Sequence, residues 1–353
     1  MNILFIPHAP NMKVINRVYE FAKNSNSYYL YWSMDNSSLY KKIVSQISSL
    51  RFDIDGKKIQ IPLFFKPERS RAKVNTIILN LLIKRLKIDV VVNANALLFD
   101  IKSIDVPVIY DLVDDHLSIN EDIGLNSQRV QKVKEDIKNS SGVICVSEIL
   151  EEKLRDLKLH QNIVTIENGL YIERFKRARS LKKSLGIEGK KIFGYIGGVD
   201  EWTGIDKACE AYLKIKNETN MMIVVGDSNR AFFKDLKQKY ADDILFVGSI
   251  APKDVANYFK SIDIGLIPFK LNDFTNNAFP IKALEYALGG AMVLSTPLKL
   301  LEHKKFPFIQ FSPIEGFDKA MQSIKKESYS FDFEAYSWQR KSQRVVDFIK
   351  SCL

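Results

Sequence analysis

Residues 191–202 read KIFGYIGGVDEW, a short apolar run that ends in two adjacent glycines. A run of this length, rich in isoleucine and aromatic residues, predicts a buried strand. Gly197 and Gly198 then allow the backbone to approach a ligand closely, and the helix expected after them begins with free N–H groups. The stretch predicts the strand–loop–helix unit of an α/β domain. It lacks the full spacing of a dinucleotide-binding or ATP-binding loop.

The alternation of strands and helices continues on both sides of this stretch. After it, the sequence predicts strands at 221–225, 244–247, 264–268 and 291–295, and helices at 206–216, 231–240, 252–260 and 281–288. Before it, strands are predicted at 3–6, 28–31, 59–63, 90–92, 108–110 and 143–146, and helices at 14–23, 39–49, 73–86, 127–138 and 148–157. The strands are continuous valine and isoleucine runs, which favours parallel sheets covered on both faces. Two successive series, the second starting after Asn168-Gly169, predict two doubly wound, Rossmann-like domains.

The bulk composition restricts the classes of protein that the chain can be. Its 353 residues are 46% hydrophobic and 27% charged, as expected for a globular protein with a large core. No apolar run approaches the roughly 18–20 residues that span a bilayer, so we expect no integral membrane segment. Cys145, Cys209 and Cys352 have no metal-site spacing, which favours a reducing cytoplasm. The net charge of +10 suggests an anionic partner, but no nucleic-acid-binding motif is present, so nucleic acid is not expected.

Two further strand-to-helix loops in the second half carry residues suited to binding an anion. Gly226 follows the strand at 221–225, as Gly197 follows the strand before it. The segment 274–293 has Pro280 at the start of a helix, Lys282 in its first turn and Glu285 three residues later on a neighbouring part of the same face. A lysine and a carboxylate placed in this way can hold a phosphate and a ribose hydroxyl, although such a pair is also common on protein surfaces.

Residues 246–296 resemble the nucleotide-sugar-binding half of glycosyltransferases with the GT-B fold, in particular the large retaining family 4. The similar segments are FVGSIAP at 246–252, DIGLIPF at 263–269, PIKALEY at 280–286 and the NG at 168–169 with Phe175. The resemblance implies two Rossmann-like domains facing each other across a cleft. Residues 1–168 would form the acceptor side, residues 169–335 would bind the donor, and a helix at 336–353 would cross back onto the first domain.

The resemblance also implies the roles of individual residues in donor binding. Backbone at Gly248, Ser249 and Ile250 would hold the base, and Glu285 the ribose. Lys282, with the helix start at Pro280 and Ile281, would take the diphosphate, with Gly197 and Gly198 on the opposite wall and Gly226 lining the same cleft. Asn277 stands where many relatives have a glutamate, so retaining transfer is favoured but inversion stays open.

The activity implied is that of a hexosyl- or glycosyltransferase that moves a sugar from a nucleoside diphosphate, UDP foremost, to a glycan or lipid-linked acceptor. The P-x-K-x-x-E variant is similar to a subset of the family that acts in capsule, teichuronic acid or exopolysaccharide assembly. The nucleotide sugar is a substrate, and we expect neither a cofactor nor a metal ion. Two alternatives remain: a nucleotide-sugar 2-epimerase of the same fold, and a non-catalytic relative that binds glycans.

In the first half, polar residues follow the strand predicted at 108–110. Asp114, Asp115 and His116 are candidates to orient or deprotonate an acceptor hydroxyl, while Asp111 can simply cap the end of the strand or pair with a nearby lysine. His8, Asn11 and Arg17 follow the first strand and are predicted to lie on the acceptor side.

The stretch 71–87, RAKVNTIILNLLIKRLK, is both apolar and basic. We expect its apolar residues to pack on the sheet, while the basic residues at its ends can touch anionic lipid. The sequence therefore predicts a cytoplasmic protein with a peripheral contact at the inner face of the cell membrane.

Overall fold

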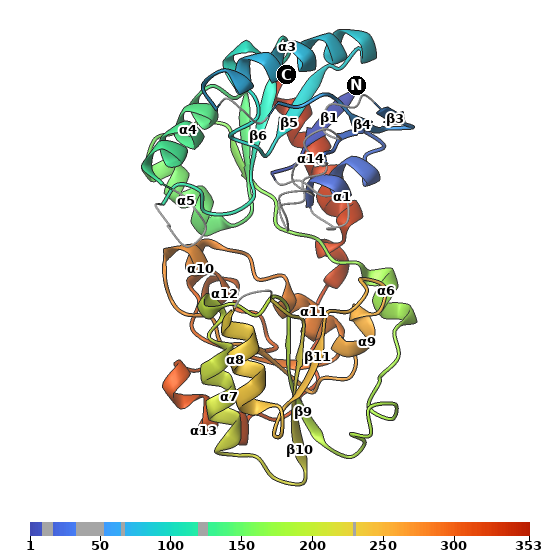
Figure 1. Ribbon diagram of the computed structural model, residues 1–353, viewed down its shortest axis with the longest axis vertical. Coiled ribbons are helices and arrows are strands. Elements are labelled where there is room, and N and C mark those ends of the chain that lie inside the picture. Colours follow the sequence, from blue (N-terminus) through green and yellow to red (C-terminus); the bar gives the residue numbers. More distant parts are fainter. Residues whose placement is uncertain (9–16, 33–52, 65–67, 119–125, 229–230) are drawn as a thin grey trace. The chain divides into compact units, whose positions relative to one another are not determined.

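The computed structural model describes residues 1–8, 17–32, 53–64, 68–118, 126–228 and 231–353. The chain forms two compact units (Figure 1). The first consists of Met1–Gly169 and Trp338–Leu353, and the second of Leu170–Ser337. The helix predicted at 39–49 and the candidate site residue Asn11 lie outside the described residues.

The first unit is built on an eight-stranded sheet with the order β3-β4-β2-β1-β5-β6-β7-β8. Its described strands are β1 (Ile3–Ile6), β2 (Tyr28–Leu30), β3 (Asp53–Asp55), β4 (Lys58–Gln60), β5 (Val90–Asn93), β6 (Val108–Leu112), β7 (Gly142–Cys145) and β8 (Ile163–Thr165). All neighbours are parallel except β3 and β4. Every residue of β1, β5, β6 and β7 is buried, because side chains on both faces are covered.

The described helices of the first unit include one from the far end of the chain. They are α1 (Arg17–Asn24), α3 (Glu68–Leu86), α4 (Ser127–Lys138), α5 (Glu148–Asp156), α14 (Trp338–Cys352) and the short η1 (Ile101–Ser103). Helix α14 packs on α1 (Figure 1). The rings of Phe21 and Trp338 meet edge to face there at 5.7 Å. The buried pair Lys341–Glu167, at 2.7 Å, ties the same helix to the segment after β8.

Helix α3 differs from the expectation that its apolar residues pack on the sheet. Leu79, Leu82 and Ile83 are buried, but Ile77 and Leu81 are 63% and 64% exposed. The prediction was therefore right for one face of the helix and wrong for the other. Helix α3 carries apolar residues on both of its faces, but only one face packs against the rest of the unit.

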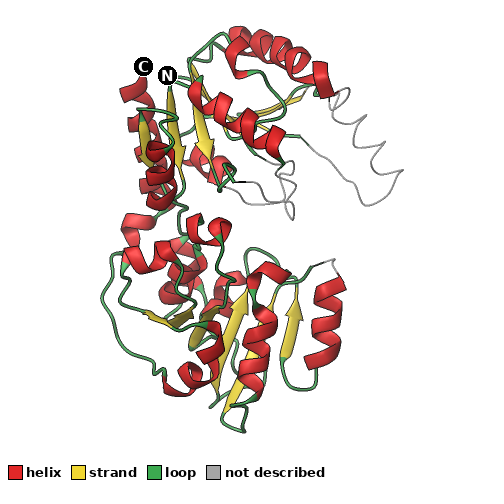
Figure 2. Ribbon diagram, turned by 90° about the vertical axis from the view of Figure 1, so that its left-hand side faces the viewer, coloured by secondary structure: helices red, strands yellow, loops and turns green. Residues whose placement is uncertain are grey.

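The second unit has a six-stranded, all-parallel sheet with the order β11-β10-β9-β12-β13-β14. Figure 2 shows its strands in yellow and the helices packed against them in red. Its strands are β9 (Lys191–Ile196), β10 (Asn220–Val225), β11 (Leu245–Gly248), β12 (Ile264–Ile267), β13 (Met292–Ser295) and β14 (Ile309–Phe311). Its described helices are α6 (Ile172–Arg177), α7 (Ile205–Leu213), α8 (Ala231–Tyr240), α9 (Val255–Phe259), α10 (Asp273–Asn277), α11 (Lys282–Leu288), α12 (Lys299–Lys304) and α13 (Phe317–Ser323), with short η3 (Glu201–Thr203), η4 (Ile314–Gly316) and η5 (Phe333–Tyr336). The prediction of parallel, doubly wound sheets is confirmed.

Each sheet has one point at which the strand order reverses. In the first unit the chain moves outward from β1 through β2 to β4 and then returns to β5 on the other side of β1. In the second it moves from β9 through β10 to β11 and returns to β12. Ligands of open α/β sheets bind beyond the carboxyl ends of the strands at such a point. The loops after β1, β5 and β6, and those after β9 and β12, are therefore the places where functional side chains are expected.

Candidate functional site

Three glycine-containing loops meet at the carboxyl edge of the second sheet. Gly197, Gly226 and Gly248 follow or end β9, β10 and β11, and all three have positive φ, at 146°, 123° and 80°. The Gly197 N–H donates to Val225 O at 2.9 Å, and the Gly226 N–H donates to Gly248 O at 2.9 Å. A Cβ atom at Gly226 would lie only 2.0 Å from Gly197 O. The glycines are therefore required for the close approach of these loops to one another.

The Lys282 ammonium lies directly beside the first of these loops, at the β9/β12 reversal point. A Cβ atom at Gly197 would be 2.6 Å from Lys282 Nζ. Nζ lies 4.3 Å from the centre of the Tyr195 ring and 5.0 Å from that of Phe269, and it donates to Tyr195 Oη at 3.4 Å. Cation–π contacts of this kind stabilise a cation while leaving one side of it open to an anion. Neither ring had been predicted as a partner of Lys282, because Tyr195 lies 87 residues before it and Phe269 lies on the far side of α10.

Lys282 has no carboxylate within ion-pair distance among the described residues, and it is half-buried. Burial lowers the pKa of its ammonium to about 8, with the Glu285 carboxylate acting in the opposite sense. A desolvated cation without a bonded counter-ion is well suited to an anionic ligand that supplies one.

Glu285 is the half-buried carboxylate one turn further along α11. Burial raises the pKa of this carboxyl to about 7, while Lys282 and Arg174 act to lower it. Arg174 lies on α6, with its guanidinium 3.6 Å from the centre of the Tyr171 ring. The structure therefore brings a second cation to the predicted pair, which sequence reasoning missed because α6 lies more than a hundred residues before α11.

Tyr286 fixes the position of α11 on the sheet. Its ring covers Gly265 of β12, where a Cβ atom would lie 2.2 Å from the ring, and its hydroxyl accepts the N–H of Ile196 at 2.8 Å. The neighbouring Phe259 meets the same ring edge to face at 5.0 Å. This contact determines where Lys282 and Glu285, on the same short helix, point.

The start of α11 differs from the expectation that several free N–H groups face the ligand. The N–H groups of Ala283, Leu284 and Glu285 donate to the carbonyls of Pro280 and Ile281, and that of Ile281 donates to Phe279 O at 2.9 Å. The turn at Pro280 and Ile281 thus accepts the N–H groups of the first turn of α11. The ammonium of Lys282, rather than a row of amides, is the main cationic feature here.

The remaining predicted residues of the second unit lie on the same edge of its sheet or beside α11. Gly198 and Ser249 are exposed, Ile250 is half-buried, and no atom lies within 4 Å of a Cβ placed at Gly248. Pro280 and Asn277 are buried, the latter at the last residue of α10. The structure thus assembles 197–198, 226 and 248–250 into one rim.

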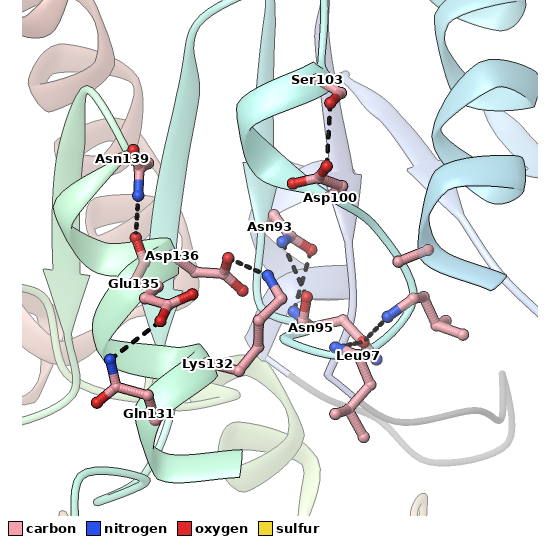
Figure 3. Close-up of polar contacts among 12 residues, drawn as sticks. Asn93, Asn95, Leu97, Asp100, Ser103, Gln131, Lys132, Glu135, Asp136 and Asn139 are labelled. Carbon is pink, nitrogen blue, oxygen red and sulfur yellow. Dashed lines mark hydrogen bonds and ion pairs between the residues drawn. The ribbon is translucent and has the colours of Figure 1, made fainter. Parts of the chain in front are cut away.

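In the first unit, the loops after β1 and β5 are joined by asparagine side chains. Asn93 and Asn95 exchange side chain and backbone hydrogen bonds, and Asn95 Oδ1 accepts the N–H of Leu97 at 2.8 Å (Figure 3). Asn95 Nδ2 donates to His8 O at 3.0 Å. This places the predicted residue His8 at the β1/β5 reversal point, and neither asparagine had been predicted as part of the site.

Arg17 is buried at the start of α1 and binds within the protein. It forms an ion pair with Asp111 at 3.0 Å and donates to Ile166 O at 2.8 Å and to Asn168 Oδ1 at 3.3 Å. The guanidinium therefore joins α1 to the ends of β6 and β8. It was predicted to face the acceptor, but these contacts make it a residue that positions the site.

Asp114 and His116 are the groups after β6 that remain available for chemistry. Both are half-buried, and no hydrogen bond to either side chain is found among the described residues. Burial and the nearby Asp115 and Asp111 carboxylates raise the pKa of Asp114 to about 7, against the effect of Arg17. Burial lowers the pKa of His116, against the effect of the nearby Asp115 carboxylate. With a pKa of about 7, the Asp114 carboxylate can accept a proton near neutrality.

Asp115 has a different role from its neighbour. It is buried, its Oδ2 pairs with Lys153 at 2.6 Å and accepts from Ser118 at 3.1 Å, and its Oδ1 accepts the N–H of Leu117 at 3.0 Å. These contacts fix the loop after β6 against α5. We therefore remove Asp115 from the catalytic candidates and keep Asp114 and His116.

Among the described residues, no group of three or more histidine, cysteine or acidic side chains is placed to hold a metal ion.

Part of the chain is similar to known glycosyltransferases. Residues 177–302 match the family model described as glycosyl transferases group 1. Over 186 residues the chain is 25% identical to the putative teichuronic acid biosynthesis glycosyltransferase TuaH of Bacillus subtilis, covering 51% of this chain and 46% of that protein. It is 26% identical over 167 residues to the alpha-monoglucosyldiacylglycerol synthase of Streptococcus pneumoniae, covering 44% and 37%. The chain thus matches less than half the length of either relative.

Solved structures share the fold of the whole chain. The Anabaena protein Alr3699/HepE, solved in complex with UDP, superimposes with a TM-score of 0.71 at 14% identity, covering 99% of this chain and 100% of that one. WaaG, a glycosyltransferase involved in lipopolysaccharide biosynthesis, gives a TM-score of 0.64 at 15% identity, covering 99% and 98%.

The chain shares the two-domain GT-B fold of these solved structures, and part of its second unit matches the group 1 glycosyltransferase family model. The matched segment, residues 177–302, contains the predicted donor-side residues Gly197, Gly226, Gly248, Lys282 and Glu285.

Proposed function

We propose that the protein transfers a sugar from a nucleoside diphosphate sugar, with UDP as the carrier, to a hydroxyl of a glycan or lipid-linked acceptor in surface polysaccharide assembly. The observation that carries the proposal is the Lys282 ammonium beside Gly197 at the reversal point of the second sheet. The match of this unit to a group 1 glycosyltransferase domain and the UDP bound by a protein of the same fold support it.

In the proposed donor complex, Lys282 contacts the diphosphate and Glu285 accepts a hydrogen bond from a ribose hydroxyl. The bond between the anomeric carbon and the β-phosphate oxygen breaks, and the negative charge that develops on that oxygen is stabilised by the ammonium. The rim at Gly248, Ser249 and Ile250 contacts the base through its backbone. The lysine supplies positive charge at the diphosphate, so the proposal invokes neither a metal ion nor a cofactor.

In the proposed acceptor complex, Asp114 accepts the proton of the acceptor hydroxyl as its oxygen bonds to the anomeric carbon. The half-buried carboxyl, with its pKa of about 7 and no hydrogen-bonded partner among the described residues, supports this assignment. We assign His116 and His8, whose charges interact with each other, to contacts with the acceptor. We propose a cytoplasmic location, peripheral to the membrane, consistent with the three free thiols of Cys145, Cys209 and Cys352.

Thermal unfolding in the presence of nucleotides tests the donor. A ligand present at a hundred times its Kd stabilises the folded state by about 2.7 kcal/mol. We expect UDP and UDP-sugars to raise the unfolding temperature more than ADP, GDP or CMP, and we expect UDP release from a UDP-sugar to depend on an added acceptor. Equal responses to all four nucleotides, or none to any, would contradict the assignment of UDP.

A further inference from the structure

Helix α3 carries a row of exposed apolar side chains, here named the α3 stripe, formed by Val74, Ile77 and Leu81. Their exposed fractions are 40%, 63% and 64%. Residues at these spacings lie on one face of a helix, and the buried residues Leu79 and Ile83 lie on the other. The stripe is therefore a second apolar face that the first unit leaves uncovered.

Single exposed apolar residues are ordinary, but an aligned set in the middle of a helix is not. Among the described residues, Ile77 and Leu81 are the most exposed of the large apolar side chains, above those at the chain ends, Met1 and Leu353. Helix α3 lies along the outside of the first unit (Figure 1). The fold does not need these side chains to be apolar, so their character points to a partner.

Basic side chains border the stripe at both ends. Lys73 is exposed beside Val74, and Lys84, Arg85 and Lys87 are exposed beyond Leu81. Lys84 pairs with Asp105 at 3.2 Å on the open surface, where such a pair is weak enough to exchange partners. An apolar row between cations is complementary to a bilayer with anionic headgroups, in which acyl chains lie below a layer of phosphates.

We propose that the α3 stripe docks the protein on an anionic lipid bilayer, with Ile77 and Leu81 inserted at the headgroup boundary and Lys73, Lys84 and Arg85 on lipid phosphates. No helix among the described residues is long and apolar enough to cross the bilayer, so α3 lies on it. A second copy of the chain is a poorer occupant, because a stable interface buries about 800 Å² per partner and the stripe presents only three side chains. This inference rests on the proposed function, because a lipid-linked acceptor would be presented at the surface of the bilayer.

Flotation with lipid vesicles tests the docking on the full chain without donor or acceptor. We expect binding to vesicles of equal parts phosphatidylcholine and phosphatidylglycerol, weaker binding to phosphatidylcholine alone, and loss of binding at high salt. Ile77→Gln and Leu81→Gln are each expected to lower the vesicle affinity by about tenfold, because each removes a side chain that inserts into the lipid. Lys84→Gln with Arg85→Gln is expected to remove most of the preference for anionic vesicles.

Matched controls lie on the same unit. Leu157→Gln removes an apolar side chain that is 45% exposed outside the stripe, and Lys138→Gln removes an exposed cation of α4. Neither is expected to change vesicle binding, and thermal unfolding checks that all variants are folded. Wild-type protein that does not float, or Ile77→Gln and Leu81→Gln proteins that float as the wild type does, would overturn the proposal. A dimer in light scattering that these two variants dissociate would also overturn it, since the stripe would then be a self-interface. UDP binding is measured separately, so failure of the donor assignment leaves this result interpretable.

Discussion

Replacing Lys282 by methionine separates ligand binding from stability, because the structure predicts opposite effects on the two. The pKa of this ammonium falls from 10.5 to about 8 on folding, so keeping it charged at neutral pH costs about 3 kcal/mol. Methionine retains the contact with the Tyr195 and Phe269 rings without that cost. The ligand-free variant is therefore expected to unfold at the same temperature as the wild type, or at a higher one.

The same substitution removes a charge-assisted contact to the diphosphate, which contributes about 1.5–3 kcal/mol. The Kd for UDP is therefore expected to rise by about 10- to 150-fold. Titration calorimetry measures this, with Lys237→Met, an exposed lysine of α8, as the matched control. An unchanged Kd in the Lys282 variant, or an equal loss in the control, would refute the assignment.

Proton linkage gives a second readout of the same lysine. Above its pKa of about 8 the ligand-free protein loses the Lys282 proton, and a bound diphosphate restores it. Wild-type affinity for UDP is thus expected to fall as the pH rises above about 8. Calorimetry at a pH one unit above the pKa of Lys282, in two buffers of different ionisation enthalpy, should show uptake of a proton when UDP binds. Persistence of that uptake in Lys282→Met would show that another group is responsible.

Three further substitutions test the rest of the site. Asp114→Asn is expected to lower kcat by about 100-fold or more while UDP affinity is retained. It is also expected to abolish the rise of kcat that the wild type shows as the pH passes through about 7. A variant that keeps this rise would exclude Asp114 as the base. Arg17→Met leaves Asp111 buried without its counter-charge and is expected to cost about 3–5 kcal/mol in urea unfolding; a wild-type midpoint would contradict that role. Gly197→Ala forces an alanine to adopt φ 146° and places its Cβ against Lys282. It is expected to lower stability by about 1–3 kcal/mol and to weaken UDP binding. Undisturbed UDP binding would argue against a contact between this loop and the nucleotide.

The central strands could be predicted from the sequence because each is a continuous apolar run. Strands β3, β8 and β14 could not, since DID, IVT and IQF are short and mixed in character. Each of them lies at an edge of its sheet. Their conformation is decided by the neighbouring strand with which they pair, and a linear pattern does not contain that neighbour.

The candidate site could be predicted where its residues are close together in the chain, as Lys282 and Glu285 are. It could not where separate segments meet. Asp114 and Asp115 are equivalent in the sequence, and only the folded chain, which brings Lys153 to one of them, tells them apart. Likewise, the approach of Arg174 to Glu285 depends on the packing of α6 on α9 beside α11, where Phe175 and Phe259 lie 5.8 Å apart.

The origin of α14 has a consequence for the order in which the protein forms during synthesis. Its residues Trp338, Val345 and Ile349 are buried in the first unit, although they are synthesised after the whole of the second unit. Until then the face of α1 that they cover is exposed to water, while the whole of Leu170–Ser337 has already emerged. The first unit therefore begins to form before the second and is completed after it. A nascent chain that stops before Trp338 would present an open apolar surface to chaperones.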